Sequence, residues 1–275
     1  MTSTSNINHI DTLDTPELAP YRTLRRPLEH IQDGIVVVES EKVVRRLLES
    51  DLQILSLLLT QYWYDRLFSD LQHRLPPTAQ VFIGEKKLLE TIVGYNLHQG
   101  IMAVARLPGK QSLDEIITDL SEPLLLVALD GLVNAENVGV VVRNCAAFGV
   151  SAMIVGETSS SPYLRRAVRN SMGTIFRMPV IHSRDLAASL HGLHEQHQVL
   201  IIGADPHERT SMQEVNMAGR VCLVFGNEDA GISSKVLEQC GKRVAIPMMN
   251  GTDSLNVASA SAVFLYEARR QRGSA

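Results

Sequence analysis

A chain of 275 residues is long enough for one large domain or two moderate ones. Hydrophobic residues make up 45% of it, which is typical of a soluble globular protein and excludes disorder as the main state. The formal net charge of −4 argues mildly against a protein that holds nucleic acid by bulk electrostatics, because phosphate binding is driven by the release of counterions.

The first twenty residues are polar, and we expect residues 1–20 to form a disordered tail. They contain no basic stretch followed by an apolar core, and apolar runs such as 52–59 are shorter than the ~20 residues that span a bilayer. We therefore expect no secretion and no membrane span. Cys145, Cys222 and Cys240 are far apart and form no CxxC pair, so buried reduced thiols and a cytoplasmic location are expected.

Residues 21–107 have the pattern of a small α/β domain, and a linker rich in Pro, Gly and acidic residues follows at 108–123. A short amphipathic turn is expected within this linker, over residues 113–120. In the small domain we expect strands at 35–38, 53–58, 80–83 and 100–105, and helices at 41–48 and 62–71.

Beyond Pro123, strands that are apolar throughout alternate with helices, which predicts a parallel sheet covered on both faces over residues 124–275. A capping-box pattern, Thr210 to Gln213, opens a short segment within this half. The expected strands are 124–129, 152–155, 178–181, 199–203, 221–225 and 243–246; the expected helices are 138–148, which Gly149 stops, 163–171, 185–196, 233–239 and one after residue 256.

Three segments of this half each end an apolar strand and supply polar side chains before a helix, where ligands of open α/β sheets collect. In DGLVNAENVGVVVRNCAAFG (130–149), Asn137 could cap the helix, whereas Arg143 lies among apolar residues and needs a partner such as an anionic ligand. In VCLVFGNEDAGIS (221–233), Gly226 can admit a ligand to the backbone, although an ordinary strand–turn–helix connection explains this segment better when it is taken alone.

The third segment, IPMMNGTDSLNVASASAVFLYE (246–267), places Ser254 and Asn256 around Leu255 before a helix of small residues. Those small residues let another backbone come close. A metal site at His191, His194 and His197 is disfavoured because HExxH is absent, and exposed helix histidines fit better. A dinucleotide-dependent dehydrogenase and the common Rossmann methyltransferases are disfavoured because no GxGxxG follows a strand.

Taken in this order, the three segments resemble the three motifs of the SpoU (TrmH-like) branch of the SPOUT RNA methyltransferases. The intervening segment SPYLRRAVRNSMGTIFRMPV (161–180) is similar too. The resemblance extends to ESEKVVRRLL (39–48) and HQGIMAVA (98–105). These segments are similar to the ribosomal-protein-like RNA-recognition domain that often precedes the catalytic domain. The resemblance implies a SPOUT domain with a deep trefoil knot that binds S-adenosylmethionine, and a homodimer with the site close to the subunit interface.

By this resemblance, Arg143 orients or activates the ribose 2′-hydroxyl, while Asn137, Glu228, Ser254 and Asn256 shape the site and position substrate. A guanidinium is a poor base, so electrostatic lowering of the hydroxyl pKa, or transfer of the proton to a phosphate, is preferred to abstraction by Arg143. The positions that correspond to adenosine contacts are Gly226, Ile246 and Leu255.

The predicted function is 2′-O-methylation of RNA, with ribosomal RNA as the first choice. The alternatives are a tRNA substrate and a non-catalytic RNA-binding or ribosome-assembly protein on the same scaffold. We expect no metal. Clusters of basic residues are alone typical of exposed helix faces, and in this context we expect RNA contacts from Arg22, Arg25, Arg26, Arg45, Arg46, Arg165 and Arg166.

Overall fold

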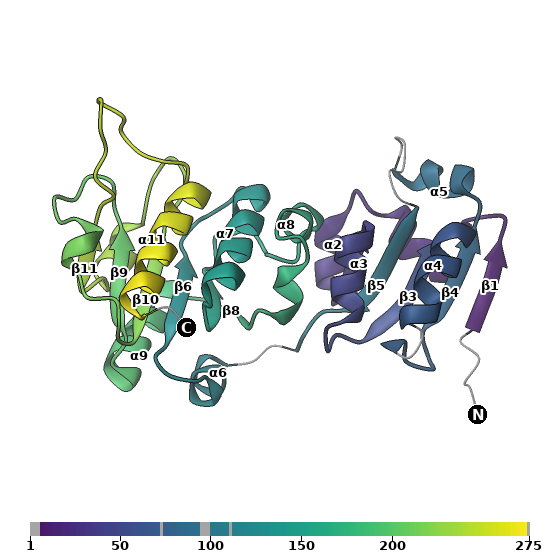
Figure 1. The fold of residues 1–275 in the computed structure, drawn as a ribbon, viewed down its shortest axis with the longest axis horizontal. Coiled ribbons are helices and arrows are strands. Elements are labelled where there is room, and N and C mark those ends of the chain that lie inside the picture. The colour runs from purple at the N-terminus through teal and green to yellow at the C-terminus, as the bar shows by residue number, and fades with distance from the viewer. Residues whose placement is uncertain (1–5, 72–73, 94–99, 110–111, 274–275) are drawn as a thin grey trace. The chain divides into compact units, whose positions relative to one another are not determined.

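The computed structural model describes residues 6–71, 74–93, 100–109 and 112–273, which fold into two compact units (Figure 1). The first unit is built from the chain up to residue 109 together with 163–177, and the second from 110–162 and 178–275. We expected 163–177 in the second half. They group with the first unit because Ala167 and Val168 are buried and Arg165 donates to Glu39 at 2.7 Å.

The first unit contains a mixed five-stranded sheet in the order β1-β4-β3-β5-β2. Parallel pairing joins β1 (Asn6–Ile10) to β4 (Gln80–Gly84) and β4 to β3 (Ile54–Leu59). The strand β5 (Ile101–Arg106) is antiparallel to both β3 and β2 (Ile35–Glu39). The helical elements are η1 (Pro16–Leu18), α1 (Ala19–Arg22), α2 (Pro27–Gln32), α3 (Glu41–Leu48), α4 (Gln61–Leu71), α5 (Lys86–Val93), α8 (Arg165–Asn170) and η3 (Thr174–Arg177).

The expectation of a disordered tail over residues 1–20 is wrong for its described part, 6–20; residues 1–5 lie outside the description. Residues 6–10 form the edge strand β1, and Leu18 is fully buried. The polar sequence of β1 gives no strand pattern. An edge strand needs none, because backbone hydrogen bonds to β4 hold it. The buried Tyr21 hydroxyl, which hydrogen-bonds Ser56 Oγ at 2.8 Å, ties the next segment to β3.

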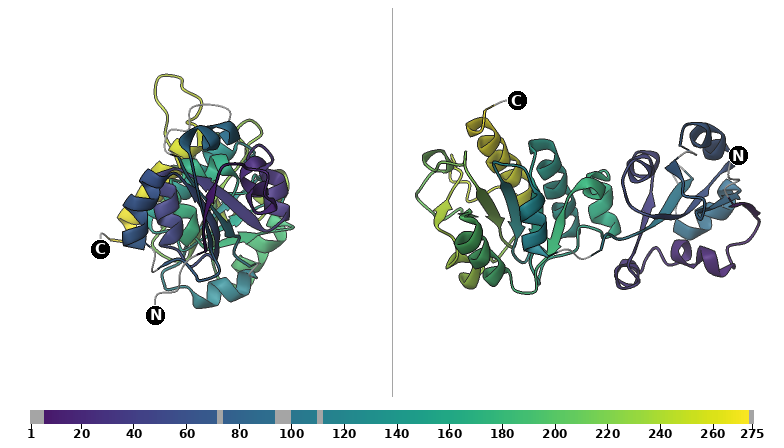
Figure 2. Two further views of the ribbon diagram at one scale, coloured as in Figure 1. Left: turned by 90° about the vertical axis from the view of Figure 1, so that its right-hand side faces the viewer. Right: turned by 90° about the horizontal axis from the view of Figure 1, so that it is seen from below.

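The second unit contains a six-stranded sheet in the order β11-β9-β10-β6-β7-β8, and each pair of neighbouring strands in it is parallel, as predicted. In Figure 2 (right), α7 and α11 lie on one face of this sheet and α9 on the other. The strands are β6 (Leu125–Leu129), β7 (Ala152–Val155), β8 (Val180–His182), β9 (Leu200–Ala204), β10 (Val221–Phe225) and β11 (Lys242–Val244). The helices are α6 (Leu113–Asp119), α7 (Ala135–Phe148), α9 (Leu186–His197), η4 (Met212–Glu214), α10 (Ser234–Leu237) and α11 (Val257–Gln271).

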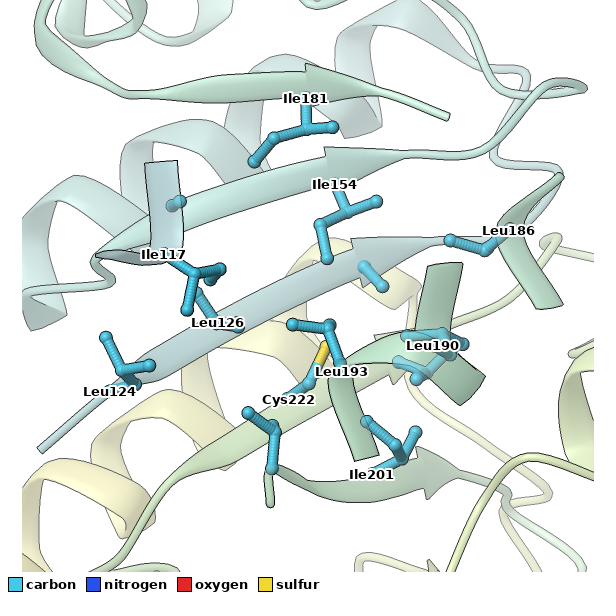
Figure 3. Packing of buried hydrophobic residues seen from close by; sticks show 14 of the residues in the cluster. Ile117, Leu124, Leu126, Ile154, Ile181, Leu186, Leu190, Leu193, Ile201 and Cys222 are labelled. Carbon is cyan, nitrogen blue, oxygen red and sulfur yellow. The ribbon is translucent and has the colours of Figure 1, made fainter. Parts of the chain in front are cut away.

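The core beneath α9 consists of side chains that converge from neighbouring strands and from the helix (Figure 3). Leu126, Ile154 and Ile181 project from β6, β7 and β8 towards Leu190 and Leu193 of α9. Alternate residues of each strand supply this face, so the other alternate residues meet α7 and α11. This is why β6, β7 and β10 are continuous hydrophobic runs in the sequence.

Two local expectations change in the second unit. The capping box is Ser211 with Glu214, one residue later than predicted: Ser211 Oγ accepts from the backbone N–H of Gln213, and the Ser211 N–H donates to Glu214 Oε1 at 3.0 Å. The amphipathic turn expected in the linker is the helix α6, and its Ile116 and Ile117 are buried in the core of this unit. That stretch is therefore part of the second unit's fold.

The end of α11 is anchored by one arginine. The guanidinium of Arg272 donates to four backbone carbonyls, those of Pro123, Leu124, Met217 and Gly219. These carbonyls belong to the segments that lead into β6 and β10, the two central strands. A planar fork with five N–H donors suits this task, and an ammonium group would not reach all four.

We expect Arg272→Ala to destabilise the protein by about 3 kcal/mol, because charge-assisted hydrogen bonds are removed and the carbonyls of the buried Leu124 and Met217 lose that donor. The melting temperature, followed by circular dichroism, should fall by roughly 6–10 °C for a chain of this size. Arg269→Ala is the matched control, since Arg269 lies exposed on the same helix and its loss should change stability by about 0.5 kcal/mol or less. Equal melting temperatures for the two variants would contradict the anchoring role.

Candidate active site

The three polar segments lie at one edge of the second unit's sheet. The strands β6 and β10 are adjacent and parallel, with Leu129 paired to Phe225, so the loops that follow them leave the sheet together. The loop after β11 reaches the same edge before α11 begins. In open parallel sheets this edge is where ligands collect.

Hydrogen bonds fix the first two loops to each other. The carboxylate of Asp130 accepts from the backbone N–H of Ser233 at 2.7 Å, and the Asn227 side chain donates to the Gly131 carbonyl at 2.8 Å. The Asn227 side-chain oxygen also accepts from the N–H groups of Asp229 and Ala230, which closes the turn after β10. The two loops therefore hold their shape through contacts that each makes with the other.

Asn137 joins all three segments. Its side-chain N–H donates to Glu228 Oε1 at 2.9 Å, and its side-chain oxygen accepts from Asn256 Nδ2 at 3.3 Å. Asn256 in turn caps α11, since its oxygen accepts from Ala258 N at 2.9 Å. The cap of α7 is Asn134, so the side chain of Asn137 is available for this bridge.

A cavity of about 510 Å³ opens beside this bridge, within the second unit. Phe225, Gly226 and Ile232 form part of its wall, and the loop after β11 contributes Ile246 and Leu255. The volume falls in the range of small-molecule sites, ~300–1,000 Å³. All three residues predicted to contact cofactor line it, and so do three of those predicted for catalysis: Gly226, Ile246, Leu255, Glu228, Ser254 and Asn256.

Gly226 is required by its surroundings. It is buried at the end of β10, and a Cβ atom there would overlap the backbone of Gly231 and Ile232. The chain turns back on itself at this point through paired hydrogen bonds between Asn227 and Gly231. In this part of the cavity wall, the backbone of Gly226 thus packs directly against the backbone of Gly231 and Ile232.

Arg143 lies on the exposed side of α7, about one and a half turns beyond Asn137. We expected it to be surrounded by apolar residues, and this is wrong: Val141, Val142 and Cys145 face the core, while Arg143 points away from it. Among the residues that the structure describes, Arg143 finds no ion-pair partner. The guanidinium is therefore accessible to a ligand from solvent. Because it is exposed to water, it does not need an anionic partner to compensate for burial.

The stripe of small residues on α11 has a partner within the same chain. Ala258 and Ser261 are buried against α7, where Asn144 donates to the Ala258 carbonyl at 2.8 Å and to Ser261 Oγ at 2.9 Å. The close approach that we expected is thus observed between α7 and α11.

Sequence reasoning gave no role to Asp130 and Asn227, which position the loops. Both are polar residues at or just beyond a strand end, which was the available signal. His191 and His194 are exposed on α9, and His197 Nε2 lies 3.1 Å from Asp114 Oδ1. Over the described ranges, no group of three or more His, Cys, Asp or Glu side chains is placed to hold a metal ion.

The arginines expected to contact RNA are largely engaged inside the first unit. Arg45 donates to Glu41 at 3.0 Å, and Arg46 to the Met172 carbonyl at 2.7 Å. Surface pairs of this kind leave part of the charge available to other anions. Further pairs are Arg22–Asp14 at 3.5 Å, Arg26–Glu29 at 3.6 Å and Arg165–Glu39 at 2.7 Å, and Arg25 and Arg166 are exposed.

Solved structures share this architecture. The SpoU methyltransferase AviRb from Streptomyces viridochromogenes superposes with a TM-score of 0.78 at 24% identity, covering 92% of this chain and 97% of AviRb. An AdoMet-bound rRNA methyltransferase from Sinorhizobium meliloti superposes with a TM-score of 0.83 at 22% identity, covering 98% and 99% of the two chains. The fold is that of a SpoU-type α/β methyltransferase.

Sequence comparison identifies the family. Residues 124–266 match the model described as the SpoU rRNA Methylase family. The uncharacterized tRNA/rRNA methyltransferase Mb0905 of Mycobacterium bovis is 31% identical over 266 residues, 94% of this chain and 90% of that protein. The 23S rRNA (guanosine-2′-O-)-methyltransferase RlmB of Pasteurella multocida is 34% identical over 204 residues, 73% and 82% of the two chains. The chain belongs to the SpoU rRNA methylase family, and the resemblance carried by the three motifs is confirmed.

We expect Gly226→Ala to displace the turn after β10 and to destabilise the second unit by several kcal/mol, because the added methyl group meets backbone that has no side chain to rotate away. Gly192→Ala is the control: nothing lies within 4 Å of a Cβ at that position of α9, and alanine should stabilise the helix by up to about 1 kcal/mol. Chemical denaturation of both variants measures the difference. If Gly226→Ala is as stable as Gly192→Ala, the packed-backbone account of this turn is wrong.

Proposed function

We propose that this protein transfers a methyl group from S-adenosylmethionine to a ribose 2′-hydroxyl of ribosomal RNA. The observation that carries the proposal is the Asn137 bridge, which joins residues of all three family motifs beside a cavity that the second and third motifs line. The name of the RlmB relative, a 23S rRNA (guanosine-2′-O-)-methyltransferase, supports both the reaction and the substrate class. The name of Mb0905 keeps tRNA as the second candidate.

The cavity fits the adenosine portion of the cofactor. Its wall at Gly226, Ile246 and Leu255 offers apolar side chains and backbone atoms, which suits a flat base held by main-chain hydrogen bonds. S-adenosylmethionine supplies an electrophilic methyl group on a sulfonium. Glu228, Ser254 and Asn256, which also line the cavity, would position the substrate nucleotide at its mouth.

Arg143 is the group we assign to the 2′-hydroxyl. An exposed guanidinium can take a phosphate next to the target ribose through paired N–H donors. Its positive charge would stabilise the developing alkoxide, and the hydroxyl proton would pass to a phosphate oxygen or to water. The guanidinium stays protonated and acts by electrostatics and orientation.

We also propose the deep trefoil knot of the family, with the C-terminal segment tucked through the loop between β9 and β10. Two sets of contacts support it. Ala245 pairs with residues 210–212 on one side of that loop, and Gln271 bonds to Val215 and Met217 on the other.

The remaining parts of the proposal concern assembly, RNA recognition and location. A homodimer with its site near the interface is supported by the exposed apolar side chains of Val133, Met249 and Tyr266, since such residues often mark interaction surfaces. The first unit would recognise RNA, including through its exposed arginines.

No helix in the described ranges is long and apolar enough to span a membrane. The free, buried thiols of Cys145 and Cys222 suit a reducing cytoplasm.

We expect Arg143→Ala to lower methyl transfer by at least about 100-fold, because the electrostatic stabilisation of the 2′-oxygen is removed. The affinity for S-adenosylmethionine, measured by calorimetry, should change little. Arg184→Ala, which also removes an exposed arginine from the second unit, is the control and should keep full activity. An Arg143→Ala variant with wild-type turnover would contradict the assigned role.

The substrate is tested by mapping ribose 2′-O-methylation in rRNA and tRNA from cells with and without the gene. We expect the deletion to remove a modification from ribosomal RNA and complementation by the wild-type gene to restore it. Loss of a tRNA modification would select the second candidate. Unchanged maps together with intact binding of S-adenosylmethionine would favour a non-catalytic RNA-binding protein.

A further inference from the structure

The first unit has a cavity of its own, with a volume of about 950 Å³, at the edge of its sheet. The parallel strands β1, β3 and β4 all end there, and its lining includes Ile10, Thr60 and Gly84 from these ends. The active site proposed above lies in the second unit and does not use this cavity.

Two aromatic side chains line this cavity, and an arginine outside the lining contacts both. Tyr62 and Trp63, at the start of α4, both line it, and their rings meet edge to face with centroids 5.2 Å apart. The guanidinium of Arg66 lies 6.0 Å from the centre of the Tyr62 ring and 5.8 Å from that of Trp63, and it donates to the Tyr62 hydroxyl at 2.8 Å. Tyr62 nevertheless remains 59% exposed, whereas Trp63 is almost buried.

The Tyr62 ring is exposed but has contacts that restrict its motion. A large apolar ring exposed to water is unfavourable, yet here it is held in place from its hydroxyl and from its ring system. A ring whose torsions are already restricted loses little entropy when a flat ligand stacks on it. The Tyr62 ring is therefore preorganised as a stacking surface.

Charged side chains line the same cavity as the Tyr62 ring. Lys86 and Lys87 supply ammonium groups, and Asp11 and Glu85 supply carboxylates. Ammonium groups pair with phosphates, while carboxylates accept hydrogen bonds from the amino groups of bases and from ribose hydroxyls. An aromatic plane with both kinds of polar group matches all three parts of a nucleotide. A purely apolar peptide would offer these four charged groups nothing to bind.

We propose that this cavity binds an unpaired nucleotide of the RNA substrate, with its base stacked on Tyr62 and its phosphate held by Lys86 and Lys87. The inference rests on the proposed function in taking RNA as the partner. Single-stranded bases are the usual target of aromatic stacking, because bases within a duplex are already stacked on their neighbours. Arg66 acts as a positioning residue for Tyr62.

The test uses the full chain and a 12-nucleotide oligo(U) RNA that carries one central 2-aminopurine, whose fluorescence is quenched when it stacks and which uridine neighbours stack on only weakly. We expect the wild type to quench the probe. Tyr62→Ala should abolish the quenching and weaken binding about tenfold, since stacking contributes ~1–3 kcal/mol per base. Tyr62→Phe keeps the ring and should retain both. Because Tyr62 is exposed, the variants are expected to fold, and their melting temperatures check this.

The lysines are tested by salt dependence. The Lys86→Ala, Lys87→Ala double variant should lower the slope of log affinity against log salt by about 0.7 for each phosphate that these lysines neutralise. The Lys235→Ala, Lys242→Ala double variant has the same change in net charge, from exposed lysines of the second unit, and should lower it less. A blunt 12-base-pair RNA duplex should compete poorly with the probe.

Two results would overturn the inference: wild-type quenching and affinity in Tyr62→Ala, or a wild-type protein that never quenches the probe. Either outcome stands apart from the proposed function, which is read by methyl transfer to total RNA from the deletion strain. If that RNA is methylated but Tyr62→Ala binds the probe like the wild type, the inference alone fails. If no RNA is methylated while Tyr62→Ala still abolishes quenching, the proposed function alone fails.

Discussion

The amide of Asn137 is the contact on which the candidate active site depends. An amide carries a donor and an acceptor on one rigid group, so a single side chain can bond a carboxylate on one loop and an amide on another. Asn137 uses its N–H on Glu228 and its oxygen on Asn256. Aspartate would place a second carboxylate against Glu228, and leucine would bond to neither. The requirement for asparagine thus follows from two partners of opposite hydrogen-bonding character.

The Asn137 bridge can form only because the strand register of the sheet places the loops next to each other. The register that pairs Leu129 with Phe225 sets the loops after β6 and β10 side by side, and the Asp130 N–H donates to the Phe225 carbonyl at 2.9 Å. The third loop arrives through α11, whose cap residue Asn256 is itself the partner of Asn137. At the other end of α11, Arg272 ties the helix to the segments that enter β6 and β10. The start of this helix is therefore bonded to α7, which follows β6, and its end to the segments that enter β6 and β10.

The parallel sheet of the second unit was predictable because its inner strands β6, β7 and β10 are runs of residues buried on both faces. The predicted bounds of β7 and β10 agree with those observed. The strand β1 was missed for the opposite reason, since it lies at an edge and is held mainly by its backbone. The Asn137–Glu228 contact joins residues 91 positions apart, and no periodicity encodes such a contact; only the family motifs placed the two residues together.

The surroundings of Arg143 show how a sequence neighbourhood can mislead. Its neighbours Val141, Val142 and Cys145 are apolar because α7 buries one face against the sheet and α11, and a helix turns its other face to solvent within two residues. An apolar sequence context therefore does not establish a buried arginine. The exposed position suits an RNA phosphate better than a buried one would, because the polymer can reach the guanidinium without the loops opening.

The charge balance bears on how such a protein would hold RNA. With a net charge of −4, and with Arg22, Arg26, Arg45 and Arg165 in ion pairs with carboxylates, bulk electrostatics gives little affinity. Stacking on an aromatic ring differs from counterion release in depending weakly on salt and on total charge. Stacking on a preorganised tyrosine such as Tyr62 therefore adds affinity for RNA that the net negative charge of the chain does not provide. Phosphate contacts then need only to set the position of a strand that stacking already retains.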